Sequence, residues 1–166
     1  MIKKCGILAA WAIALYVLQT SLLPLVAWRG VSTDFMLLLT VSFGFLRGAR
    51  FGVLMGFCSG LLQDLGSGTF LGINVFNLMV LGFLCGKFSD KVFKDQFFLP
   101  IMAAVAAAAI DYVMTAAFVF LLGYPFDFAA HVRANFLPAI FWQVIFAYPV
   151  HLITYKIDQC LQDKNI

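Results

Sequence analysis

The strongest constraint in this sequence is a series of apolar stretches, several of which are long enough to cross a lipid bilayer. The first covers residues 6–26, and a membrane-spanning helix needs about 20 predominantly apolar residues. Hydrophobic residues make up 63% of the chain and charged residues only 11%, whereas roughly 25% of the residues in a typical soluble domain are charged. The sequence therefore predicts an integral membrane protein and argues against a water-soluble globular domain.

The hydropathy pattern predicts an all-α membrane protein, a compact bundle of six transmembrane helices. The predicted spans are residues 6–26, 35–46, 51–65, 70–86, 97–123 and 135–155. Six spans of about 20 residues use roughly 120 positions, and the rest of the 166 residues serve as termini and loops. We therefore expect a single integral membrane domain over residues 1–166, with the first span retained as an uncleaved helix.

The basic residues are distributed unevenly over this arrangement. If the N-terminus is cytoplasmic, only Arg29 and Arg133 of the eleven Lys and Arg residues fall outside. The other nine fall inside: Lys3, Lys4, Arg47, Arg50, Lys87, Lys91, Lys94, Lys156 and Lys164. Cytoplasmic loops of membrane proteins are enriched in Lys and Arg, so we predict that both termini are cytoplasmic.

The second and third predicted spans are short for a full crossing. At a rise of 1.5 Å per residue, 12 to 15 residues extend over about 18–23 Å, less than the ~30 Å hydrocarbon core. Two helices can still cross where the bilayer thins and where Arg47 and Arg50 extend toward the interface. The alternative is a re-entrant hairpin, which would leave both arginines at membrane depth. We favour full crossing.

Glycine supplies the most regular pattern in the chain. It recurs every four residues at Gly44, Gly48, Gly52, Gly56 and Gly60, and Asp64 takes the next position. Residues four apart lie on one side of a helix, and positions without side chains let another backbone approach closely. We expect this stripe to pack against a helix of the same chain, and a docked partner helix is the alternative.

Two acidic residues fall at the outer ends of the short spans. Asp34 directly precedes the apolar run at residues 35–46, as a helix-capping residue does, and Asp64 ends the glycine stripe. Two nearby carboxylates can also serve acid–base catalysis. We favour structural or interaction roles for both: capping helices, holding loops, pairing with Arg29 and Arg133, or docking a partner.

Asp111 is unusual because it lies near the middle of the fifth predicted span. An acidic side chain inside a membrane is costly and marks a candidate functional site. Internal hydrogen-bond partners for it are available in Asn74, Asn77 and Gln143. We expect Asp111 either to lock the bundle through such a bond or to contact a partner or solute.

The reactive residue types form no pattern typical of catalysis or metal binding. The cysteines show no CxxC or His-paired spacing: Cys5, Cys58, Cys85 and Cys160. His131 and His151 have no Cys, Glu or second His at ligand spacing. Phosphate-binding and hydrolase motifs do not occur either. We therefore expect no enzyme activity, no cofactor, no metal and no nucleic-acid partner.

Several short segments occur together in a specific order. Residues 18–24 read LQTSLLP, Asp34 is followed by FMLLL, residues 60–64 read GLLQD after the glycines, and Leu71 and Gly72 open the fourth span. In this order, over roughly residues 15–90, they resemble the MreD family of rod shape-determining membrane proteins. Beyond that range hydropathy and length agree, and Thr33 stands where the family usually has Pro.

The resemblance implies a non-enzymatic scaffold subunit of the bacterial cell-elongation machinery in the plasma (inner) membrane. It implies a contribution to cell shape and to sidewall peptidoglycan synthesis, through helix contacts with the bitopic protein MreC. It also implies indirect links to the filament protein MreB and to wall-synthesis enzymes.

The alternative function is that of the solute-binding membrane subunit of an energy-coupling-factor vitamin transporter. Such subunits are six-span bundles of similar size. A binder needs a cavity with converging polar groups, which Asp34, Gln63, Asp64 and Asn74 could line. We favour the scaffold.

Overall fold

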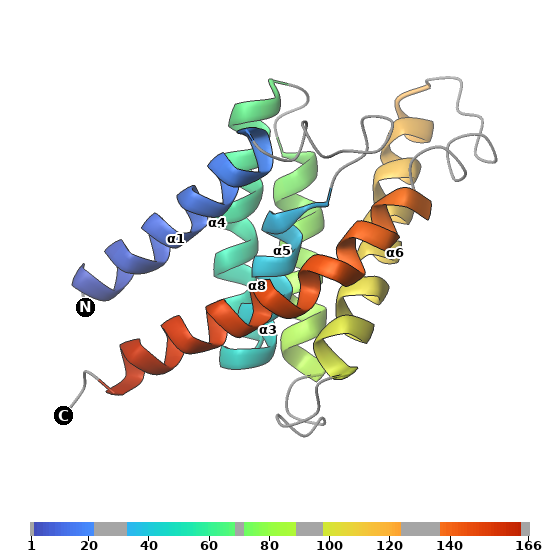
Figure 1. Ribbon diagram of the computed structural model, residues 1–166. Coiled ribbons are helices and arrows are strands. Elements are labelled where there is room, and N and C mark those ends of the chain that lie inside the picture. The colour runs from blue at the N-terminus through green and yellow to red at the C-terminus, as the bar shows by residue number, and fades with distance from the viewer. Residues whose placement is uncertain (1, 22–32, 69–71, 89–97, 124–136, 164–166) are drawn as a thin grey trace.

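The computed structural model describes residues 2–21, 33–68, 72–88, 98–123 and 137–163, and over these ranges it contains six helices and no strand. The helices are α1 (Ile2–Ser21), α3 (Phe35–Arg47), α4 (Ala49–Ser67), α5 (Ile73–Phe88), α6 (Phe98–Leu121) and α8 (Leu137–Asp163). Figure 1 shows α8 running diagonally across the bundle, with α6 on one side and α1 on the other. The predicted all-α class with six helices is confirmed.

The central helix of the bundle is α3. Every residue from Phe35 to Gly44 is buried, and α3 contacts each of the other five helices. A helix that is apolar on all sides is typical of a position enclosed by other helices. Its internal hydroxyl groups are accommodated within the helix or by a neighbour; the hydroxyl of Thr40, for example, donates to the backbone oxygen of Met36 at 2.9 Å.

A single residue separates α3 from α4. Gly48 has a φ of 83°, a conformation that glycine adopts without steric strain and that other residues rarely adopt. Its amide donates to the oxygen of Gly44 at 2.9 Å, and its oxygen accepts from the amide of Gly52 at 3.0 Å. The chain therefore reverses between two consecutive helices, which places α3 and α4 side by side.

Several helices extend beyond their predicted spans, and the clearest cases are α4 and α8. The third span was predicted at residues 51–65, but α4 covers Ala49–Ser67, so the predicted loop residues Gly66 and Ser67 are helical. The sixth span was predicted to end at Tyr155, but α8 continues to Asp163. Hydropathy marks the residues that suit lipid, whereas a helix ends where its hydrogen bonding ends, so polar helical turns were read as loops.

The helices differ in their fitness to cross a bilayer. Among the described residues, Ile101–Leu121 is the one helical segment that is both long and apolar enough to cross. Only 11% of the residues in its most apolar part are buried. Three apolar helices are shorter: Gly6–Ser21, Phe35–Arg47 and Ile73–Phe88. The 13 residues of α3 extend over about 20 Å at 1.5 Å per residue. Large apolar side chains such as Val113 and Phe120 are exposed on α6.

Candidate functional site

Three glycines of α4 bring its backbone into direct contact with the backbone of α5. A Cβ atom on Gly56 would lie 2.6 Å from the carbonyl carbon of Leu78, and one on Gly60 would lie 2.6 Å from the amide nitrogen of Val75. Gly52 faces α5 in the same way. No side chain fits at these separations, so glycine is what allows α4 and α5 to make the most extensive helix contact in the structure.

Glycines also form the α5 side of this contact, and they were not predicted as interface residues. A Cβ atom on Gly82 would lie 2.5 Å from the carbonyl carbon of Gly52, and one on Gly86 would lie 2.6 Å from that of Gly48. Gly44 of α3 is at the same junction, where an added Cβ would lie 3.2 Å from the oxygen of Gly82. Gly82 and Gly86 have the same spacing of four, so the signal was present in the sequence.

Gly48 differs from the other members of the predicted glycine stripe. It lies in the turn, and a Cβ atom there would meet nothing within 4 Å. Its contribution is the positive φ described above, not a helix contact made through a missing side chain. A spacing of four residues does not distinguish a helical position from a turn, which is why the sequence pattern appears continuous across two helices.

The carboxylate of Asp64, at the end of α4, caps the N-terminus of α5. Its Oδ2 accepts hydrogen bonds from the amides of Gly72 at 2.7 Å and Val75 at 3.3 Å, and its Oδ1 accepts from the amide of Asn74 at 3.3 Å. Amides at a helix start lack partners within the helix, and the helix dipole favours a negative charge there. Asp64 is fully buried, so these amides replace the water that would otherwise solvate it.

Asp34 caps α3 at the same end of the bundle. Its Oδ1 accepts from the amides of Met36 at 2.9 Å and Leu37 at 3.1 Å. The same oxygen accepts from Nε2 of Gln63 at 2.7 Å. Gln63 precedes Asp64 on α4, so two adjacent residues at the end of that helix fix the starts of both α3 and α5.

Two other glutamines also reach the start of α3. Gln19 of α1 accepts from the amide of Phe35 at 3.0 Å, and Gln143 of α8 accepts from the amide of Asp34 at 3.3 Å. The partners are separated by 16 and 109 positions in the chain, so no local sequence signal indicates the contacts. Helices α1, α4 and α8 thus each contribute one glutamine side chain that contacts the N-terminus of α3.

Asp111 lies midway along α6, close enough to the side chain of Asn77 on α5 for the amide to interact with its carboxyl group. Asn77 is fully buried, and its Nδ2 donates to the hydroxyl of Thr115 at 2.9 Å. Of the three amide residues considered as partners for Asp111, Asn77 is therefore the one placed beside it. The side chain of Gln143 and the backbone amide of Asn74 take part in the two helix caps.

The opposite end of α3 is held by an ion pair with α8. Nε of Arg47 donates to Oδ1 of Asp158 at 2.5 Å, and the two side chains are 21% and 4% exposed. The guanidinium also lies 4.5 Å from the ring centroid of Phe51. Two turns earlier on α8, Nδ1 of His151 lies 3.2 Å from the hydroxyl oxygen of Ser42. Asp158 was not predicted as a site residue because it lay in the segment read as a tail.

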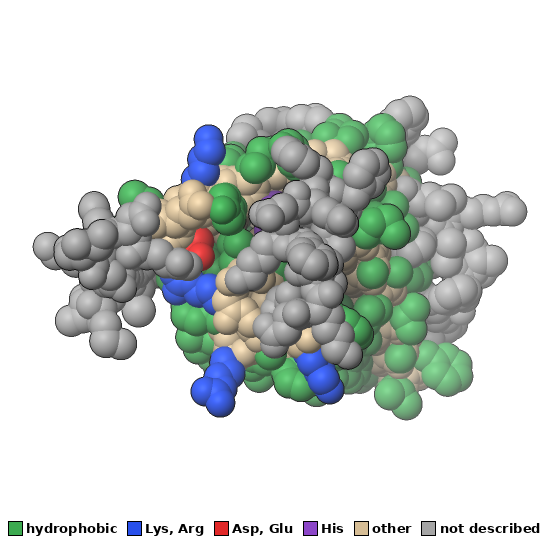
Figure 2. All heavy atoms as spheres, turned by 90° about the horizontal axis from the view of Figure 1, so that it is seen from below, with side chains coloured by type: hydrophobic (Ala, Val, Ile, Leu, Met, Phe, Trp, Pro, Cys, Tyr) green, Lys and Arg blue, Asp and Glu red, His purple; other side chains and the backbone are tan. Residues whose placement is uncertain are grey.

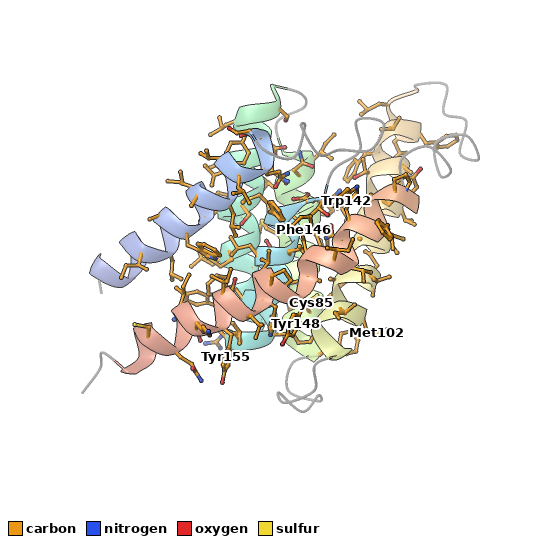
Figure 3. All side chains as sticks on the ribbon, viewed as in Figure 1. Cys85, Met102, Trp142, Phe146, Tyr148 and Tyr155 are labelled. Carbon is orange, nitrogen blue, oxygen red and sulfur yellow. The ribbon has the colours of Figure 1, made fainter. Side chains whose placement is uncertain are left out.

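Aromatic side chains complete the contact between α8 and the core. The rings of Trp142 and Phe146 stack with centroids 5.9 Å apart, and Figure 3 shows them on successive turns of α8. Phe146 also meets Phe35 edge to face, with centroids 5.3 Å apart. These contacts anchor α8 near the capped end of α3, whereas Arg47 and Asp158 anchor it at the other end.

Basic side chains gather at the end of the bundle that carries the α3–α4 turn. Figure 2 shows Lys and Arg side chains around this face, with hydrophobic side chains at its edges. The exposed basic residues described there are Arg50, Lys87 and Lys156. All three belong to the set predicted to be cytoplasmic.

The described polar groups mainly end helices and join them. Among these residues, no group of three or more His, Cys, Asp or Glu side chains is arranged to hold a metal ion. Cys58, Cys85 and Cys160 are free thiols. The arrangement therefore fixes the positions of helices relative to one another, and the groups that do so come from all six.

Comparison with known proteins gives one family match. The family model described as rod shape-determining protein MreD matches residues 5–160. Comparison with curated proteins and with solved structures gives no significant match.

Proposed function

Because the chain belongs to the MreD family of rod shape-determining proteins, we propose that it is a non-enzymatic membrane scaffold of the bacterial cell-elongation machinery. The observation that carries this proposal is the family match, which extends over nearly the whole chain. The contacts support it, since Asp34 and Asp64 each bond to a helix terminus and Asp111 lies beside Asn77 of a neighbouring helix. These are the contacts expected of a protein that acts by holding helices in place.

In the proposed function the six helices lie in the plasma membrane with both termini in the cytoplasm. Exposed apolar surface on α6 suits lipid or the helix of another membrane protein. The basic end of the bundle then faces the cytoplasm, in keeping with the enrichment of Lys and Arg there.

The direct partner in this proposal is an MreC-type bitopic membrane protein. Such a protein links the scaffold to an MreB-type filament and to enzymes of sidewall peptidoglycan synthesis. The glycine face of α4 is occupied by α5, so the partner helix docks on exposed apolar surface. Ile13 and Val17 on α1, and Val113 and Phe120 on α6, are exposed apolar positions of this kind.

Depletion in a rod-shaped host tests the function. Cells that lose the protein are expected to become round, and a plasmid copy of this chain is expected to restore rods. Growth should not depend on an added vitamin. Normal rods after depletion, together with a vitamin bound to the purified protein, would contradict the scaffold and support a transporter subunit.

Site-specific photo-crosslinking in native membranes tests the partner. A photoreactive residue at position 13, 17, 113 or 120 is expected to capture an MreC-type protein from at least one helix. The matched control is position 78, because Leu78 is buried against α4 and should give no intermolecular product. Capture of no protein from any exposed position would contradict direct docking.

A further inference from the structure

A groove between α5 and α6 is lined entirely by apolar side chains. Its volume is about 390 Å³. On the α5 side the lining includes Leu81, Leu84 and Phe88, which follow one another at helical spacing. On the α6 side it includes Met102 and Ala106. The small side chain of Ala106 leaves the space that the larger groups of α5 do not fill.

The groove is open to the outside of the bundle along α6, from Met102 at the basic end to Ile110. Met102 is 66% exposed and Phe88 is 55% exposed, and Figure 3 shows Met102 and Cys85 toward the same end of the two helices. From Phe88 to Leu81 the groove follows seven residues of helix, or about 10 Å at 1.5 Å per residue. Its long direction therefore leads from the membrane surface toward the interior.

A positive charge lies beside the mouth of this groove. Lys87 is exposed and lies three residues after Leu84 of the lining, so these two side chains share one side of α5. The same end of the bundle carries exposed Arg50, in the first turn of α4, and exposed Lys156, two residues before Asp158 on α8. The carboxylate described at this end, that of Asp158, is already bound to Arg47.

We propose that this groove binds one acyl chain of an anionic phospholipid, whose phosphate is bound by Lys87. The two parts of the site match the two parts of such a lipid, because an apolar channel continues inward from a cation at the surface. Juxtamembrane Lys and Arg residues attract anionic headgroups. The occupant is a phospholipid of the surrounding bilayer.

The size of the groove argues against a helix as its occupant. One turn of helix, about 10 Å across and 5.4 Å long, occupies roughly 400 Å³, which is already the whole volume. A single hydrocarbon chain is far thinner and can follow the length of the groove. A polar ligand would lose its hydrogen bonds to water there without replacement.

Native mass spectrometry of the purified full-length protein tests the site. The probes are phosphatidylglycerol and phosphatidylcholine with identical acyl chains, in mixed micelles. The wild-type protein is expected to retain phosphatidylglycerol at least five-fold more than phosphatidylcholine. Ala106→Phe fills the groove and should lower retention of both lipids about five-fold. Ala117→Phe, an exposed position further along α6, is the matched control and should leave retention unchanged.

Lys87→Gln distinguishes the contribution of the lipid headgroup to binding from that of the acyl chain. It should remove the preference for phosphatidylglycerol and leave phosphatidylcholine retention unchanged, whereas Lys156→Gln at the same end should have no effect. Wild-type retention in both Ala106→Phe and Lys87→Gln would overturn the proposal. Each variant is compared with the wild type by thermal unfolding, so that lost retention is scored only in folded protein.

A photoreactive diazirine residue at position 102 identifies the occupant directly. Labelling of a phospholipid in native membranes supports the site. A crosslink to a second protein, to another segment of this chain or to an isoprenoid lipid at that position would overturn it.

Discussion

The carboxylate of Asp64 caps the helix that follows its own. It lies near the end of α4 and is fully buried. It accepts hydrogen bonds from the backbone amides of Gly72 at 2.7 Å and Val75 at 3.3 Å. Because α5 begins only after Gly72, the carboxylate reaches across the intervening loop. One side chain therefore ties the end of α4 to the start of α5.

Asp64→Ala is expected to destabilise the protein by about 1–3 kcal/mol. The change removes the acceptor for three backbone amides, and loss of a helix cap or of a buried acceptor accounts for this range. Asp64→Asn keeps one acceptor oxygen and should lose less. Thermal unfolding in detergent measures both variants. Equal stability of Asp64→Ala and wild type would contradict the capping role.

Gly56→Leu is expected to lower stability by about 1–3 kcal/mol, since the new side chain overlaps the backbone of Leu78 and forces α4 away from α5. Phe57→Leu is the control, because Phe57 is exposed on the same helix. Its unfolding temperature should stay close to that of the wild type. An unchanged Gly56→Leu protein would mean that α4 and α5 do not approach through this glycine.

The ion pair between Arg47 and Asp158 should show coupling of about 1–3 kcal/mol, between the values for exposed and buried pairs. A double-mutant cycle of Arg47→Gln and Asp158→Asn, measured by unfolding, gives this coupling directly. Arg50→Gln, at an exposed position in the same turn, is the control. If the two substitutions are additive, the pair does not hold α8 to α3.

Substitutions of Asp111 distinguish hydrogen bonding from charge. Asp111→Asn keeps a polar group beside Asn77 and should retain most of the ability to restore rods. Asp111→Leu removes the polar group beside the buried Asn77, and should reduce rod restoration and capture of the MreC-type partner. Immunoblots of membranes check that both variants insert equally. Loss of function in Asp111→Asn alone would show that the charge itself is required.

Reporter fusions test the six-span topology. Fusions after Gly30, Gly68 and Pro125 should report the outside, and fusions after Arg50 and Lys91 should report the cytoplasm. Gly68 is the informative position, because α3 and α4 form one hairpin around Gly48. A cytoplasmic signal at Gly68, or an outside signal at Arg50, would replace the crossing pair with a different arrangement.

Hydropathy was sufficient to predict six helices, because each apolar run is separated from the next by polar residues. The start of α3 at Phe35 was also predictable, since Asp34 is a capping residue placed directly before an apolar run. The helix ends were less predictable. Polar turns such as those ending at Ser67 and Asp163 continue a helix without being apolar.

Most contacts between the site residues could not be predicted from the sequence, because the contacting residues are far apart in the chain. Arg47 and Asp158 are separated by 111 positions, and Asp34 and Gln143 by 109. Such pairs depend on how helices cross, which a single sequence does not specify. The exception is the α5 side of the glycine contact, where Gly82 and Gly86 carried the same spacing as the stripe on α4.

The contact between α4 and α5 has a mechanical consequence. Gly52, Gly56 and Gly60 bring main chain against main chain over eight residues, or about 12 Å of helix. Glycine has no rotamers to exchange, and close-packed interiors resist compression. We therefore expect α4 and α5 to move together as one rigid pair of helices. A displacement of the α3–α4 turn at Gly48 is therefore expected to move the buried carboxylate of Asp64, near the other end of α4, as well.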